Sequence, residues 1–171
     1  MGNSFFVYLQ QLQLMAFFSG YPLLYAIILF FARKKLPQNN FRNRIVSLLP
    51  FAYALIGTLY IGFQLKNLSL NYSAANVKHL FMQPWLLIWA LLSLLFWLPA
   101  FSKKKELSFI HSLVFFFFLV KDIVSQITGS LGGREMLQND MRIYTVSFFL
   151  NLGALLLITL LSFAIGFIKR N

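Results

Sequence analysis

The sequence has no cysteine and very few acidic residues. Without cysteine, the chain can form no disulfide, no thiolate metal site and no cysteine nucleophile. Only four of the 171 residues are Asp or Glu and two are His, so there is almost no material for a catalytic or metal-binding constellation. The motifs HExxH and GxSxG are also missing. We therefore expect no enzymatic activity, no metal and no cofactor.

Charged residues of both signs are scarce. In a soluble domain roughly a quarter of all residues are charged, whereas in this chain 11% are charged and 59% are hydrophobic. Lipid must therefore be the solvent for most of its surface. The net charge of +11 comes from short basic runs between apolar blocks, which is how topology determinants are placed in membrane proteins. The sequence thus predicts an integral membrane protein that does not bind nucleic acid.

Basic residues divide the sequence into five long apolar segments. About 20 apolar residues are needed to cross roughly 30 Å of hydrocarbon as a helix. The predicted spans cover residues 5–32, 45–65, 83–101, 107–128 and 143–168. The fold prediction is therefore an all-α membrane protein with one domain over residues 1–171, built as a bundle of five transmembrane helices.

The fourth segment is the least regular of the five. Only residues 107–120 lie between Glu106 and Lys121, enough for roughly 21 Å of helix. Either this segment enters half of the membrane and returns, or it continues through Lys121 and Asp122 to about residue 128. Five full crossings would put ten basic residues on one side, including those of "RKKLPQNNFRNR" and "KKKE". A returning segment would separate the first of these runs from the basic tail, so we favour a full crossing.

The distribution of basic residues also predicts the orientation. The positive-inside rule places the N-terminus outside and the C-terminus in the cytoplasm, and we expect a bacterial cytoplasmic membrane. The basic loop between the first two spans serves this orientation and could also contact anionic lipid headgroups. Its cationic residues are Arg33, Lys34, Lys35, Arg42 and Arg44.

Several polar side chains fall at a similar depth in the outer leaflet. Lysine can extend its amine to the headgroups, but the shorter Asp122 side chain needs a partner or a proton. His111 and Gln126 lie along the same edge of this predicted helix as Asp122. The predicted intramembrane polar layer consists of Gln10, Gln13, Lys121, Asp122, Gln126 and Asn151.

This layer has three interpretations. The residues could hold the helices together through interhelical hydrogen bonds. Lys121 or Asp122 could pair with an opposite charge on another subunit. Asp122 could also accept a proton or cation in a pocket open to the outside.

Small residues spaced four apart predict faces where helices pack closely. The second and fifth spans carry them. These helix-packing residues are Ala54, Thr58, Gly62, Ser162 and Gly166.

The predicted function follows by elimination. The sequence encodes almost no material outside the membrane and no catalytic group. We expect a small non-catalytic integral-membrane subunit that packs against or stabilises a larger membrane complex, with other integral membrane subunits and lipids as its partners. The alternative is a small transporter or channel that uses Asp122 in an outer-leaflet polar pocket.

Overall fold

The first apolar segment contains a break that the sequence analysis did not predict. A computed structural model describes the fold over residues 11–33, 40–70, 84–128 and 133–168. Residues 11–18 are helical, Ser19 and Gly20 form a turn, and helix α2 runs over Tyr21–Arg33. Pro22 has no N–H, and proline is well tolerated in the first turn of a helix, so a new helix begins here.

The second segment forms one long helix, α3 (Asn40–Leu70). It extends beyond the predicted bounds of 45–65 at both ends. Its 31 residues correspond to roughly 46 Å, which exceeds a hydrocarbon thickness of about 30 Å. The helix must therefore tilt or project beyond the apolar layer.

The third segment differs most from its prediction. Instead of one helix over residues 83–101, it consists of α5 (Pro84–Leu92), the 3₁₀ helix η1 (Ser93–Trp97) and α6 (Pro99–Ser102). Proline disfavours helical geometry in the residue before it, and Leu98 is accordingly extended, with φ −78° and ψ 135°. The apolar helix therefore ends at Trp97 and is only roughly 24 Å long.

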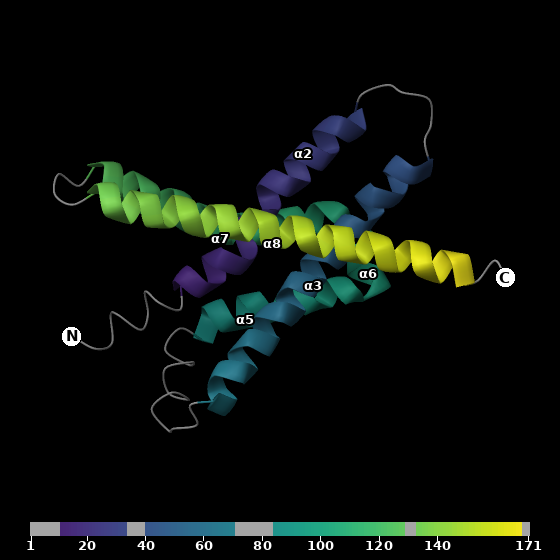
Figure 1. Ribbon diagram of the computed structural model, residues 1–171, viewed down its shortest axis with the longest axis horizontal. Helices are drawn as coiled ribbons and strands as arrows, with labels where there is room; N and C mark the ends of the chain where they lie inside the picture. The colour runs from purple at the N-terminus through teal and green to yellow at the C-terminus, as the bar shows by residue number, and fades with distance from the viewer. Residues whose placement is uncertain (1–10, 34–39, 71–83, 129–132, 169–171) are drawn as a thin grey trace.

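The last two segments form a hairpin of long helices. Helix α7 (Lys105–Thr128) continues unbroken through Lys121 and Asp122, close to the predicted bounds of 107–128. Helix α8 (Gly133–Ile168) begins well before the predicted start at residue 143. Figure 1 shows α7 and α8 side by side along the long axis of the molecule, with α2 and α3 crossing them obliquely.

The structure confirms the all-helical fold class and the four longest apolar segments. These runs, Gln11–Ala32, Asn43–Leu68, Lys105–Ser125 and Met141–Ile165, are long and apolar enough to cross a membrane. They indicate an integral membrane protein.

The core lies where helical residues 11–18, α2, α3 and α7 meet, with further side chains from α5, η1 and α8, and its largest members are aromatic. Its largest fully buried side chains are Tyr21, Tyr53, Tyr60, Phe18 and Phe115. Burial is uneven among the helices. Half of the residues in the apolar runs Gln11–Ala32 and Asn43–Leu68 are buried. Only 24% are buried in the run in α7 and 22% in the run in α8. The described residues therefore fully bury only a minority of the side chains in the apolar runs of α7 and α8.

Candidate functional site

The break in the first span leaves backbone groups without helical partners. The last hydrogen bond before it runs from Ser19 N to Met15 O, and the first after it from Leu24 N to Gly20 O. The Gly20 N–H and the Phe17 carbonyl lie between these bonds. In hydrocarbon no water can satisfy such groups, so another part of the protein must do so.

Two side chains of α8 bond to these groups. Gly20 N donates to Ser147 Oγ at 2.9 Å. Asn151 Nδ2 donates to Phe17 O at 2.8 Å and to Ser147 O in its own helix, also at 2.8 Å. Ser147 and Asn151 are one turn apart on α8 and both are buried. Asn151, a member of the predicted polar layer, therefore satisfies the backbone of the broken span.

The two helices are in backbone contact at this point. A Cβ atom added to Gly20 would lie 2.6 Å from Phe148 Cα and from Ser147 C. Only glycine permits this approach, because real Cβ contacts are not that short. Gly20 therefore both weakens the helix locally and admits α8 to the break.

A second polar pair lies on the preceding turn of the first span. Gln64 Nε2 in α3 donates to Gln13 Oε1 at 3.0 Å. Gln13 is one helical turn before Phe17, the acceptor for Asn151. Gln13 and Asn151, both members of the predicted layer, therefore make their hydrogen bonds at successive turns of the first span. Gln13 lies in that span, and Asn151 reaches it from α8.

The remaining predicted layer residues come mostly from α7. Gln10 lies outside the described residues. The backbone of Asp122 and Gln126 is helical, but their side chains lie outside what the structure describes. Lys121 is exposed on the side of α7 that faces away from the bundle.

A polar contact around His111 was missed by the sequence analysis. Its Nδ1 lies 2.7 Å from the hydroxyl of Tyr53 in α3. The Trp89 ring of α5 stacks on the imidazole, with centroids 4.8 Å apart and planes 3° from parallel, and Trp89 Nε1 donates to His111 O at 3.2 Å. His111 Nε2 is buried without a hydrogen-bond partner among the described residues. This contact joins α3, α5 and α7.

A related contact ties the start of α2 to the start of α7. Tyr21 Oη and Ser108 Oγ are 2.8 Å apart. Because Ser108 Oγ donates to Lys105 O at 2.7 Å, Tyr21 is the donor in that pair. The Tyr21 and Tyr53 ring centroids are 4.5 Å apart, so the two polar contacts share one aromatic core.

Replacing Tyr53 by phenylalanine is expected to destabilise the bundle by about 1–2 kcal/mol. The substitution keeps the ring but removes the hydroxyl that pairs with His111, leaving a buried polar atom unsatisfied. Tyr60→Phe is the matched control. The Tyr60 hydroxyl is also buried, but its one polar interaction, with Gln64, lacks hydrogen-bonding geometry, so its removal should change stability less. Thermal unfolding in lipid nanodiscs measures both; equal losses would contradict this role for the Tyr53–His111 contact.

The predicted packing residues fall on different faces. Ala54 is fully buried. Thr58 is exposed and accepts a hydrogen bond from Trp97 Nε1 at 3.0 Å. Gly62 is also exposed, and a Cβ there would meet nothing within 4 Å, so it forms no packing face within the described bundle. The close approach on α3 is instead at Gly57, where an added Cβ would lie 3.0 Å from the Cβ of Ser93 in η1 and still closer to its Oγ.

Two of the remaining predicted residues, Arg44 and Ser162, contact each other at one end of the bundle. Ser162 accepts hydrogen bonds from Arg44, one of the predicted headgroup or topology residues. The surroundings of five other predicted residues lie outside the description, namely Arg33, Lys34, Lys35, Arg42 and Gly166.

Comparisons add no functional information about these contacts. No protein-family model, curated protein or solved structure matches the chain. Within the described residues, no group of three or more His, Asp or Glu side chains could hold a metal ion. The arrangement is therefore interpreted from its own geometry: buried polar groups that mostly pair with backbone or with one another, and a lysine on the outside of α7.

Proposed function

We propose that this chain is a non-catalytic integral-membrane subunit that packs against a larger membrane assembly through the outer face of α7. The observation that carries the proposal is Lys121, a charged residue within the apolar run Lys105–Ser125 that is exposed at the surface of the bundle. Charged side chains in membrane segments usually face the protein interior or pair with another charge. Among the side chains that the structure describes, none pairs with Lys121, and a partner helix would provide such a group.

The surroundings of Lys121 support a helix as the partner. Phe117, Val120 and Val124 are exposed and follow the three- and four-residue spacing of one helix face. Phe117 is 67% exposed, among the highest values of the described apolar residues. The proposed partner is a transmembrane helix with an apolar face and an Asp or Glu at the depth of Lys121.

The use of polar groups inside the bundle also favours a packing role. Ser147 and Asn151 bond to the backbone of the broken span, and Gln13 and Gln64 bond to each other. Such bonds contribute on average about 0.6 kcal/mol each in membranes and specify how helices pack. They therefore support the interpretation of these residues as structural contacts.

Five crossings, with the N-terminus outside and the C-terminus in the bacterial cytoplasm, remain part of the proposal. In Figure 1 the end of α2, the start of α3 and the end of α8 lie toward the right, whereas the end of α3, the end of α7 and the start of α8 lie toward the left. Alternation of this kind is compatible with five crossings. The short third segment would then cross with help from local thinning of the bilayer.

Single-cysteine labelling tests this topology directly, because the chain has no cysteine of its own. Lys104→Cys, in the turn before α7, is expected to react with a membrane-impermeant maleimide only after the cells are opened. Thr128→Cys, at the end of α7, should react in intact spheroplasts. Reaction of both positions from the same side would contradict a full crossing by α7.

Purification in a mild detergent tests the subunit role. The wild-type chain is expected to elute with one partner at fixed stoichiometry. Lys121→Gln should weaken partner retention about tenfold, corresponding to about 1.4 kcal/mol for an unpaired carboxylate on the partner. Arg142→Gln, an exposed charge at the start of the span in α8, is the matched control and should retain the partner. Elution of the wild-type chain as a lone monomer would contradict the proposal.

A further inference from the structure

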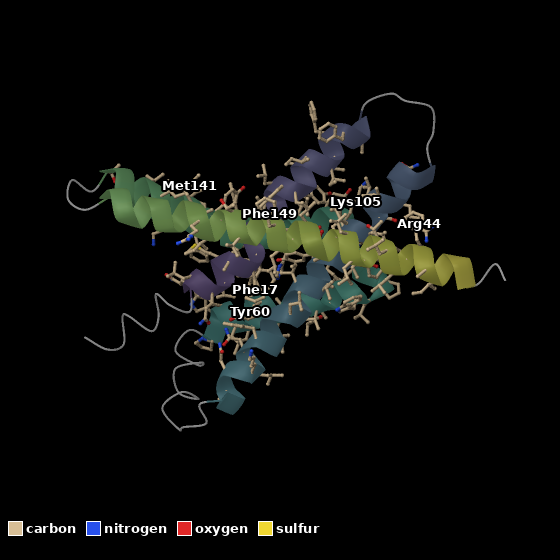
Figure 2. The ribbon with its side chains drawn as sticks, in the orientation of Figure 1. Phe17, Arg44, Tyr60, Lys105, Met141 and Phe149 are labelled. Atoms are coloured by element: carbon tan, nitrogen blue, oxygen red, sulfur yellow. The ribbon has the colours of Figure 1, made fainter. Side chains whose placement is uncertain are left out.

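One end of the bundle is strongly basic. The first 105 residues contain no Asp or Glu, and Glu106 is the only acidic residue before Asp122. Lys103 and Lys104 are exposed in the turn that precedes α7. Figure 2 shows Arg44 and Lys105 at the opposite end of the molecule from Met141. This end therefore presents positive charge with little compensation from carboxylates.

Among the cations that the structure describes at this end, Arg44 makes the most contacts that fix its side chain. Its Nε donates to Ser162 Oγ at 3.2 Å, and one terminal nitrogen donates to Ser162 Oγ at 2.9 Å and to Ser162 O at 2.5 Å. The guanidinium carbon also lies 4.4 Å from the centroid of the Phe163 ring. These contacts fix the plane of the guanidinium against α8.

The same contacts leave part of the guanidinium available. The other terminal nitrogen of Arg44 takes part in none of them and makes no hydrogen bond to the described residues. A planar guanidinium held in place in this way can bind an oxygen anion with little further loss of side-chain entropy.

The position of Arg44 along the membrane span indicates which anion a bilayer would supply there. Arg44 is the second residue of the apolar run Asn43–Leu68, and Ser162 and Phe163 lie near the end of the run Met141–Ile165. Both runs thus reach their polar boundary at the guanidinium. Lipid phosphates lie at this boundary of a bilayer.

We propose that Arg44, oriented by Ser162 and Phe163, binds the phosphate of an anionic phospholipid. Lys103 and Lys104 raise the local positive potential and attract lipids of negative net charge to the same surface. The site goes beyond the proposed subunit role, because it lies at the basic end of the bundle and uses none of the residues of the α7 face.

Native mass spectrometry of the delipidated full chain tests this site. The probes are dioleoyl-phosphatidylglycerol and, as the zwitterionic comparison, dioleoyl-phosphatidylcholine. The wild-type chain is expected to bind phosphatidylglycerol more tightly. Arg44→Gln should weaken this binding about fivefold, since each cation near an anionic membrane surface contributes about 1 kcal/mol. It should weaken phosphatidylcholine binding less, because the choline cation compensates the charge of its phosphate.

Three further variants keep the test decisive. Ser162→Ala retains the charge of Arg44 but removes one of its anchors, and is expected to reduce binding about twofold to threefold. Lys103→Gln with Lys104→Gln should weaken binding about thirtyfold at low salt, since two cations contribute about 2 kcal/mol, and this effect should disappear near 1 M salt, where the Debye length is about 3 Å. Arg142→Gln, at the other end of the bundle, should bind like the wild type.

The proposal is overturned by any of three results. Phosphatidylglycerol could bind the wild-type chain no better than phosphatidylcholine. The second such result is that Arg44→Gln binds phosphatidylglycerol like the wild type. If Arg44→Gln does not fold, the same result for the Ser162→Ala and lysine variants takes its place. Inorganic phosphate could also displace the lipid headgroup at equal concentration, which would identify a site for free phosphate rather than for a lipid.

Discussion

A Gly20→Leu chain is expected to lose the native packing of α8 on the first span, at a cost of about 3 kcal/mol or more. A side chain at residue 20 would meet the backbone of Ser147 and Phe148, with contacts of 2.6 Å already at Cβ. Overpacking usually costs about 1–3 kcal/mol when side chains can move aside, and backbone atoms yield less easily. Separation of the helices would also break the bond from Gly20 N to Ser147 Oγ. Gly20→Ala should produce a smaller loss in the same direction.

Gly62→Leu is the matched control for this substitution. Both glycines lie in long apolar segments, but a Cβ at Gly62 meets nothing within 4 Å. Leucine also favours a helix over glycine by about 0.8 kcal/mol, so Gly62→Leu should leave the stability unchanged or raise it. Thermal unfolding in lipid nanodiscs compares the two. An equal loss at both positions would contradict the close approach at Gly20.

Replacing Asn151 by leucine is expected to cost about 2–3 kcal/mol. The change keeps a side chain of similar size but leaves the Phe17 carbonyl without its donor inside hydrocarbon. Ser147→Ala should act in the same way on the Gly20 N–H. Because the two side chains serve one break, the double variant should lose less than the sum of the two single losses.

Thr145→Val on the same helix is the control for these losses. Thr145 is exposed, and its hydroxyl donates only to Met141 O within α8. The substitution should therefore change stability by less than about 0.5 kcal/mol. Reversible unfolding in nanodiscs measures all four variants. If Asn151→Leu were as stable as Thr145→Val, the hydrogen bonds to the broken span would not support the fold.

The apolar spans could be predicted because basic residues bracket them, although α3 and α8 continue past these charges. In α7, the helix begins at Lys105, the last residue of the basic run Lys103–Lys105, and the apolar pattern continues after Lys121 and Asp122. The interruptions were harder to predict, although the residues responsible are plain in the sequence. Pro99 ends the third segment because it makes Leu98 extended. A proline inside a helix need not break it, as Pro50 within α3 shows. Local sequence therefore did not decide which prolines interrupt a span.

The sequence predicted that buried polar side chains would find partners within the protein, but it did not predict which partners. A buried amide in lipid must find a partner, so Asn151 was expected to face protein. Its partner is the carbonyl of Phe17, and a backbone carbonyl leaves no signal in the sequence. Gly57 and Gly62 occur on the same helix, and only the position of η1 determines that Gly57 makes the close contact. The Tyr53–His111 pair likewise depends on how α3 and α7 pack.

Site-specific photo-cross-linking in native membranes tests the subunit role most directly. A photoreactive residue at Phe117 or Val124, on the exposed face around Lys121, is expected to give one protein adduct of defined mass. That adduct should disappear when Lys121→Glu is added. The same residue at Leu160, which is 70% exposed on α8, should react only with lipid. Lipid adducts alone from all three positions would contradict a partner helix on α7.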